Sequence, residues 1–154
     1  MIKLRDMTDA EYQEWLPRQT QSHADAKVKA GNWDAEKALE LARAQTAEVL
    51  PLGLKTPHHE IFVVESKGKA VGVVWFAIKE SPRGPYAYLY DIEVDEAYRG
   101  KGFGSQAMSA LEEKLKKRGI KSLLLHVFGY NQDALRLYQR LGFEITNINM
   151  AKRL

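Results

Sequence analysis

The chain contains 154 residues, of which 45% are hydrophobic and 28% are charged, with a net charge of +3. This length predicts one domain spanning residues 1–154, and the composition is that of neither a disordered chain nor a membrane protein. The sequence has no cysteine, which excludes disulfides, thiolate metal sites and cysteine nucleophiles. The first residues lack the apolar core of a signal peptide and no run is long enough to span a membrane, so we expect a cytoplasmic protein.

The first half of the sequence predicts an edge strand, two helices and a pair of strands. Thr8 or Asp9 can cap the first helix, which we expect to reach Gly31–Asn32 with a break near Pro17. Asp34 can cap the second helix. A change to alternating, β-branched residues then predicts two strands joined by a short turn. These elements are expected at residues 2–5, 9–31, 34–50, 60–66 and 70–79.

The second half of the sequence predicts alternating strands and helices around a glycine-rich loop. Gly119 can end the longer helix, and Asn131 can cap the shorter one. The order of elements indicates a mixed α/β (α+β) layer structure. A strand, the loop, a helix, a strand, a short helix and one or two final strands are expected at 86–95, 98–105, 103–118, 120–128, 131–142 and 143–154.

The glycine loop is the most informative segment. Its glycines allow close backbone approach to a ligand, and the unpaired N–H groups at the start of the next helix can hold phosphates. The loop does not match a nucleotide-binding P-loop. The run from Gly102 to Ala107 matches a Rossmann fingerprint, but His126 and Phe128 stand where that fold needs an acid. A tight turn without a ligand is the remaining interpretation.

The surroundings of the loop resemble the GNAT acetyltransferase family. Arg99, Gly102 and Gly104 match its R/Q-x-x-G-x-G/A motif, and the segments Asn131–Tyr138 and Leu141–Phe143 match its second hallmark, N-x-x-A-x-x-L-Y-x-x-x-G-F. The whole chain is similar to the YycN-like bacterial branch. This resemblance implies a mixed, mostly antiparallel sheet with splayed central parallel strands and flanking helices.

The resemblance also implies acetyl-CoA as co-substrate and N-acetyltransferase activity toward a primary amine, by direct attack in a ternary complex. The pantetheine arm is expected between strands 86–95 and 120–128, where splayed strands leave backbone groups to pair with its amides. A backbone N–H near Ile92–Val94 is expected to polarise the thioester carbonyl. The residues expected to bind the cofactor are Ile92, Val94, Arg99, Gly100, Lys101, Gly102, Phe103, Gly104, Ser105 and Asn131.

Three residues are the candidates for proton transfer. Tyr138 holds the position of the family's usual acid, although a buried structural tyrosine would fit the same helix pattern. His126 and Glu93 are the candidate bases, acting directly or through water, and Asp91 lies two residues from Glu93. Strand parity places Asp91, Glu93, Leu124 and His126 on one face of the sheet, and Tyr90, Ile92 and Val94 on the other.

The acceptor stays open between small molecules, peptides, proteins and aminoacyl-tRNA. The segment after Phe143 is short for the hairpin that covers the acceptor site in many family members, so the N-terminal helices or a partner subunit in a homodimer must shape that site. A CoA-binding regulatory domain without turnover is the alternative function. The chain lacks the dense basic face of a nucleic-acid-binding protein. No metal site is expected, because His58, His59 and Glu60 lack metal-ligand spacing. Four aromatic residues line either the acceptor pocket or the core: Trp33, Trp75, Tyr88 and Tyr90.

Overall fold

The computed structural model describes residues 1–154 as one five-stranded sheet with helices on both faces. No helix is both long and apolar enough to cross a membrane. The strands are β1 (Ile2–Asp6), β2 (His59–Ser66), β3 (Lys69–Lys79), β4 (Tyr86–Val94) and β5 (Leu123–Leu125). The helices are α1 (Asp9–Lys29), α2 (Ala35–Val49), α3 (Phe103–Lys117) and α4 (Gln132–Arg140), with short 3₁₀ turns η1 (Gly53–Lys55) and η2 (Glu96–Tyr98).

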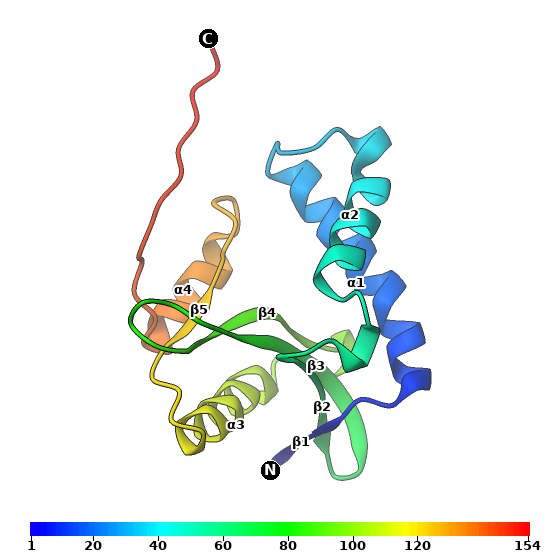
Figure 1. Ribbon diagram of the computed structural model, residues 1–154, viewed down its shortest axis with the longest axis vertical. Coiled ribbons are helices and arrows are strands. Elements are labelled where there is room, and N and C mark those ends of the chain that lie inside the picture. The colour runs from blue at the N-terminus through cyan, green and yellow to red at the C-terminus, as the bar shows by residue number, and fades with distance from the viewer.

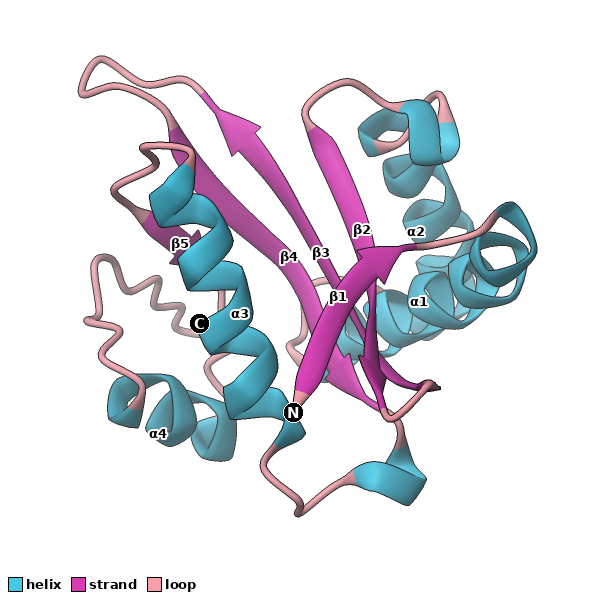
Figure 2. Cartoon of the chain, turned by 90° about the horizontal axis from the view of Figure 1, so that it is seen from below, coloured by secondary structure: helices cyan, strands magenta, loops and turns pink.

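The strand order is β1-β2-β3-β4-β5, antiparallel from β1 to β4 and parallel between β4 and β5. Helices α1 and α2 lie on one face of this sheet, and α3 lies on the other (Figures 1 and 2). We call these the site face and the core face, respectively. The mixed sheet with one parallel pair at its end confirms the predicted fold class.

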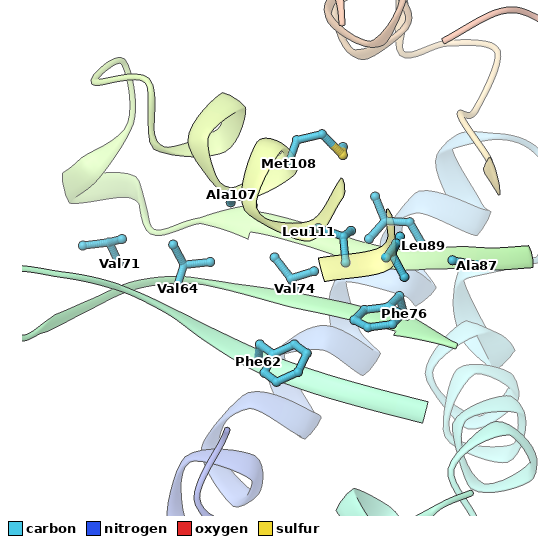
Figure 3. Packing of buried hydrophobic residues seen from close by; sticks show 11 residues of the cluster. Phe62, Val64, Val71, Val74, Phe76, Ala87, Leu89, Ala107, Met108 and Leu111 are labelled. Atoms are coloured by element: carbon cyan, nitrogen blue, oxygen red, sulfur yellow. The ribbon is translucent and has the colours of Figure 1, made fainter. Parts of the chain in front are cut away.

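The core face is closed by the apolar stripe of α3. Ala107, Met108, Leu111 and Leu115 are all buried and recur at helical spacing. They pack against alternate residues of the central strands, such as Val74 and Phe76 of β3, to form one cluster of 11 buried residues (Figure 3). Burial of this apolar surface is the main force that holds α3, and therefore the glycine loop before it, on the sheet.

The site face is packed by aromatic side chains. Trp15 of α1 is buried and meets Trp75 of β3 edge-on, with ring centroids 5.5 Å apart. Helix α1 runs unbroken through Pro17, so the expected break there is wrong. The length of this helix is what brings its second half over the end of the sheet where β5 lies.

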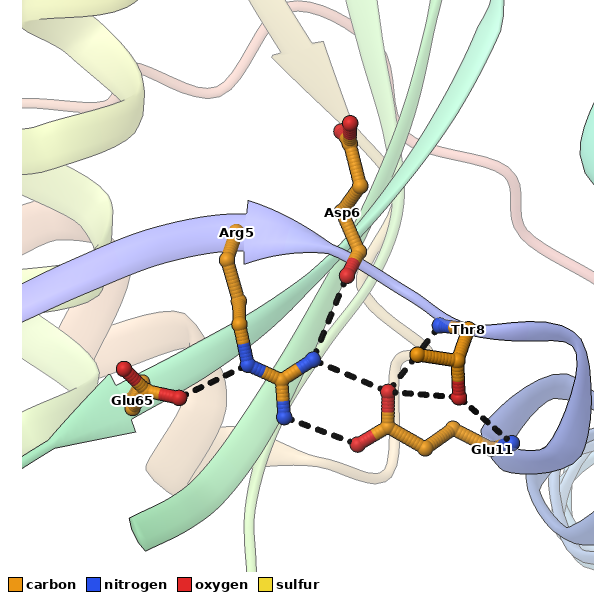
Figure 4. Close-up of polar contacts among 5 residues, drawn as sticks. All are labelled: Arg5, Asp6, Thr8, Glu11 and Glu65. Atoms are coloured by element: carbon orange, nitrogen blue, oxygen red, sulfur yellow. Dashed lines mark hydrogen bonds and ion pairs between the residues drawn. The ribbon is translucent and has the colours of Figure 1, made fainter. Parts of the chain in front are cut away.

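A polar cluster fixes the start of α1 against β1 and β2 (Figure 4). Arg5 donates to Glu11 at 2.9 Å and to Glu65 at 2.7 Å. Thr8 and Glu11 form a reciprocal capping box. Hydrogen bonds from Arg5 are the largest cause that lowers the pKa of Glu11, to about 2. The hydrogen bonds of Arg5 and the capping box of Thr8 and Glu11 together fix the direction in which α1 leaves the sheet.

A bulge in β4 changes which residues share a face. Trp75 pairs with Asp91 and Phe76 pairs with Leu89, which leaves Tyr90 as an extra residue. Leu89 and Ile92 consequently both pack on the core face, whereas the Tyr90 ring stacks on Trp75 on the site face at 4.5 Å. The expectation that Tyr90 shares a face with Ile92 and Val94 is therefore wrong, because one extra residue inverts the alternation.

The C-terminal third contains less strand than the sequence predicts. The expected strand at 120–128 is reduced to Leu123–Leu125, and no strand forms in residues 143–154. The tail instead leaves α4 in an extended path that runs beyond the rest of the chain (Figure 1). Its apolar residues find no partner inside the chain that would convert their strand propensity into a strand.

Candidate functional site

A gap between β4 and β5 is the central feature of the site. The two strands pair only from Ala87↔Leu123 to Leu89↔Leu125, while β4 continues to Val94 in contact with β3. The edge of β4 that faces β5 is therefore open from Tyr90 to Val94, over about 17 Å at the usual rise per residue. Backbone groups on such an edge are free to pair with an extended ligand that carries amides.

The glycine loop lies at one end of this gap. Gly102 caps α3 with φ 82°, and Gly100 has φ 77°, conformations that favour glycine. No side chain caps the helix, and none of the loop and cap hydrogen bonds comes from the N–H groups of Phe103, Gly104 or Ser105. These groups are available to an anion, as the sequence predicts.

The loop is tied to the end of β4 by Arg99, whose Nε donates to Val94 O at 2.9 Å. Lys101 reaches over the Tyr98 ring, with Nζ 5.8 Å from its centroid. A β-carbon on Gly104 would meet the Val94 side chain at 3.8 Å, an ordinary contact. Packing within the chain therefore does not require a glycine at position 104. The absence of a side chain there is explained if a ligand occupies the space.

A pocket lies at the other end of the gap, between the site face and helices α1 and α2. It has a volume of about 350 Å³ and contains no carboxylate. His23 Nε2 and Gln45 Oε1, 2.9 Å apart, join the two helices across it. Its lining residues are Gln19, His23, Lys27, Gln45, Thr46, Val49, Trp75, Tyr88, Leu89, Tyr90, His126 and Phe128.

His126 lies at the exposed rim of this pocket, one residue beyond β5. Partial burial, and then the charges of Lys27 and His23, lower its pKa below the ordinary 6.5. The imidazole is consequently neutral at physiological pH and can accept a proton. Its ring meets Phe128 edge-on, with centroids 4.8 Å apart.

Two carboxyl groups follow one another on the site face of β4. Glu93 forms an ion pair with Arg18 of α1, with 3.3 Å between Oε1 and the guanidinium. Asp91 is more deeply buried, and its Oδ2 has no hydrogen-bond partner. Burial, and then repulsion by Glu93, raise the pKa of Asp91 from 3.8 to about 7. A carboxyl group with this pKa changes charge near neutral pH.

Tyr138 reaches toward the same region from α4. Its ring packs against Phe143, with centroids 5.7 Å apart, and against the core-face cluster. No hydrogen bond of the chain involves its hydroxyl group. Burial, and then the charge of Asp91, raise its pKa above 10, so the phenol is protonated at neutral pH. Asn131 caps α4, and its Oδ1 accepts from the Ala134 N–H at 3.2 Å.

Of the other residues singled out in the sequence, some line the pocket and others have structural partners. Trp75, Tyr88 and Tyr90 line the pocket, whereas Trp33 packs against buried alanines of α1 and α2. His59 Nδ1 accepts from the Trp75 indole at 3.0 Å, and Glu60 is paired with Arg118. Both side chains therefore have structural partners.

The sequence analysis expected the N-terminal helices or a partner subunit to shape the acceptor site, but it did not identify the residues of the helical wall. Gln19, His23 and Lys27 line it from α1, and Thr46 lines it from α2. The available signal is the spacing of the three α1 residues, which recur every four positions and so form a polar stripe along one side of the helix. A polar stripe that faces a sheet, instead of solvent, indicates a site.

Comparison with known proteins identifies what this arrangement resembles. Residues 8–143 match the model of the Acetyltransferase (GNAT) family. An uncharacterized N-acetyltransferase, YycN of Bacillus subtilis (strain 168), is 39% identical over 99% of both chains. The crystal structure of YycN superposes with a TM-score of 0.94, covering 100% of this chain and 99% of that one at 38% identity. The structure of AAC(6')-Iy with a CoA-containing bisubstrate analogue matches with a TM-score of 0.64 at 20% identity, covering 100% and 98% of the two chains, which shows the shared fold.

Proposed function

The chain belongs to the GNAT acetyltransferase family, and from this premise we propose that residues 1–154 act as one domain that acetylates a primary amine by direct attack, with both substrates bound together. One observation carries the proposal. The open edge of β4 runs from the pocket, at Leu89 and Tyr90, to the glycine loop, which touches Val94. A single strand edge thus links a phosphate-binding end to an acceptor pocket.

The residues along this edge fit acetyl-CoA, which supplies the acetyl group as a thioester when bound. We assign its phosphates to the free N–H groups of Phe103, Gly104 and Ser105 and to the charges of Arg99 and Lys101. The backbone of Ile92 and Val94 would pair with its amides. Gly100, Gly102 and Asn131 complete the assigned set through backbone conformation and an amide side chain.

The groups that move protons come from the pocket rim at His126, from β4 at Glu93 and from α4 at Tyr138. We assign His126 as the base that takes the proton of the acceptor ammonium, because it lies at the pocket rim and is neutral at physiological pH. Glu93 is the alternative base, acting through water while paired with Arg18. Tyr138 is protonated and its hydroxyl group makes no internal hydrogen bond, so we assign it as the acid for the leaving thiolate.

The charge of the pocket points to the class of acceptor. Lys27 lines the pocket, and Lys79 Nζ lies 4.9 Å from the centroid of the Tyr88 ring and 5.2 Å from that of Tyr90. A cationic pocket without a carboxylate favours loss of the ammonium proton and attracts an anion. We therefore propose a small-molecule or peptide acceptor that carries an acidic group beside its amine.

The direct test is thiol release from acetyl-CoA with a panel of amines in matched pairs, each acidic amine beside its neutral amide. We expect turnover with at least one amine, and a lower KM for the acidic member of each pair. Binding of CoA without turnover on any amine would instead support a regulatory CoA-binding domain. Turnover that favours the neutral members would reject the acceptor class alone.

The assignment of the base has its own test in the pH profile. With saturating acetyl-CoA, the rate should rise as His126 loses its proton, along a limb that lies below pH 6.5. His126→Gln should remove that limb. If Glu93→Gln costs more rate than His126→Gln and the limb survives in the His126 variant, the assignment passes to Glu93.

A further inference from the structure

Two aromatic rings of the pocket are held by a histidine that lies outside it. Trp75 of β3 and Tyr90 of β4 both line the pocket, and their rings stack with centroids 4.5 Å apart and planes 14° apart. We call this pair the aromatic platform. His59 of β2 is not part of the pocket lining, but its Nδ1 accepts a hydrogen bond from Trp75 Nε1 at 3.0 Å. Its ring also lies beside that of Tyr90, with 5.3 Å between the centroids.

The aromatic platform fixes the direction of the Tyr90 side chain. Tyr90 is the extra residue of the β4 bulge, and a bulge residue is left out of the ladder of paired strands. Its ring is held instead by the stack on Trp75 and by Lys79, whose Nζ lies 5.2 Å from the ring centroid. The pairing of β4 with β5 ends at Leu89, so Tyr90 is also the first residue of the gap. The orientation of Trp75 therefore shapes the pocket at the point where the gap begins.

One hydrogen bond fixes the rotation of the Trp75 indole. The indole N–H is the only hydrogen-bonding group of this side chain, and His59 is its acceptor. Trp75 is buried, so without that acceptor its N–H would be left unpaired away from water, which costs free energy. Ring contacts tolerate a range of tilts, whereas a hydrogen bond has a preferred direction. His59 therefore defines the plane against which Tyr90 stacks.

The charge state of His59 suits this contact. Burial, and then the charges of Lys79 and His58, lower its pKa below the ordinary 6.5, so the imidazole is neutral at physiological pH. A neutral imidazole accepts at one nitrogen and donates at the other, and acceptance at Nδ1 places its proton on Nε2. A charged imidazole would instead donate at both nitrogens and turn an N–H toward the indole N–H.

We propose that His59 is a positioning residue for acetyl transfer, which acts through Trp75 and Tyr90 to hold the acceptor amine at the start of the β4–β5 gap. The glycine loop that we assign to the phosphates of acetyl-CoA lies at the opposite end of the gap, where Arg99 is bonded to Val94. Loss of His59 should therefore weaken the binding of the acceptor and leave that of acetyl-CoA intact. This role rests on the proposed function, whereas the contact with Trp75 does not.

The first test compares two substitutions of His59 by steady-state kinetics. His59→Phe keeps a ring beside Tyr90 but has no acceptor, and we expect it to raise the KM for the amine about tenfold with the KM for acetyl-CoA within about twofold. His59→Gln keeps an acceptor oxygen and should restore most of the loss. His58→Asn, at the exposed neighbouring position, is the matched control and should change neither KM. A wild-type KM for the amine in His59→Phe, or an equal rise in both KM values, would overturn the proposal.

The second test is a double-mutant cycle between His59 and Trp75. Trp75→Phe removes the indole donor, so in that background His59→Phe should cause no further rise in the KM for the amine. If His59→Phe alone does not fold because the indole N–H is left unpaired, the double variant, which lacks both groups, should recover the fold. Equal effects of His59→Phe in the two backgrounds would show that it acts independently of Trp75, and would overturn the proposal.

The third test reads the hydrogen bond directly and needs no turnover. The chain has three tryptophans, so nuclear magnetic resonance should show three indole N–H signals, and Trp75→Phe identifies the one that belongs to Trp75. We expect that signal to move upfield in His59→Phe, because the N–H loses its acceptor, and to change less in His59→Gln. An unchanged signal in His59→Phe would reject the positioning role. If no amine is turned over, the proposed function fails, and this signal alone decides whether His59 holds Trp75.

Discussion

The two faces of the sheet differ in the kind of atoms that they bury. On the core face, α3 closes an apolar cluster in which Leu111 and Phe76 have no exposed surface. On the site face lie the three buried polar side-chain atoms that make no hydrogen bond of ordinary geometry: Trp15 Nε1, Gln19 Oε1 and Asp91 Oδ2. The Trp15 indole still lies near enough to Asp91 to lower the pKa of its carboxyl group. Such atoms cost stability and are retained where a site uses them. The sheet thus separates a stabilising face from a reactive one.

The largest effect should come from a group that lies between the two faces. Tyr138→Phe keeps the ring that packs on the core-face cluster and removes only the hydroxyl group. We expect turnover to fall by about 10² to 10⁴, as is typical when a general acid is lost, with CoA affinity within a few-fold. Steady-state kinetics and calorimetry check this. Wild-type turnover would make the tyrosine structural, and a loss of folding would assign it to the core face.

A truncation on the core face should act on stability alone. Leu111→Ala should lower the free energy of unfolding by about 2–5 kcal/mol, because it leaves a cavity under α3. His126→Gln, at the exposed rim of the pocket, should change it by less than about 0.5 kcal/mol. Denaturant unfolding of both variants measures the contrast. If the two variants lost equal free energy of unfolding, the core face would not be the face that stabilises the fold.

Asp91 should make the stability of the site face depend on pH. Its pKa is raised from 3.8 to about 7, so the folded state holds a proton that the unfolded state has lost between these values. Stability from this group is complete below pH 3.8 and falls as the pH rises to about 7, by about 4 kcal/mol at most. The charged groups that influence it are Glu93 on its own strand and Arg18 of α1, and Tyr138 of α4 also lies near it.

Replacing Asp91 with a residue that does not titrate should therefore raise the stability of the protein most at high pH. Relative to wild type, Asp91→Asn should gain stability as the pH rises from 4 to 8, and Asp133→Asn, on a largely exposed carboxyl group, should not. Thermal melts across this pH range give the comparison. An Asp91→Asn variant that runs parallel to wild type would show that the carboxyl group is hydrated and is not poised for proton transfer.

The sequence predicts the local motifs well and the long-range geometry less well. The loop from Arg99 to Gly104 and the cap at Asn131 depend on neighbouring residues, so their patterns survive in the structure. The Tyr90 bulge carries no glycine or proline signal. It leaves Ile92 on the expected core face but puts Tyr90 on the site face. Parity alone could not place Tyr90 for that reason.

The pocket and the tail lie beyond what sequence patterns resolve. Gln19 and Thr46 line one pocket only because α1 and α2, which are distant in sequence, pack side by side. The tail has strand propensity, but propensity becomes a strand only where a partner edge is available. The family membership predicted from two motifs is confirmed by the match over residues 8–143.

The most direct test of the account is CoA binding by Gly104→Val, measured by calorimetry beside wild type. A β-carbon at 104 meets only an ordinary contact with Val94 within the chain, so we expect the variant to fold and to melt as wild type does without ligand. Wild type should bind CoA and, at about 100 times the dissociation constant, gain about 2.7 kcal/mol of stability. The account predicts at least a tenfold loss of affinity in the variant. Equal affinity in a folded variant would contradict it, because the loop beside the β4–β5 gap would then be only a turn.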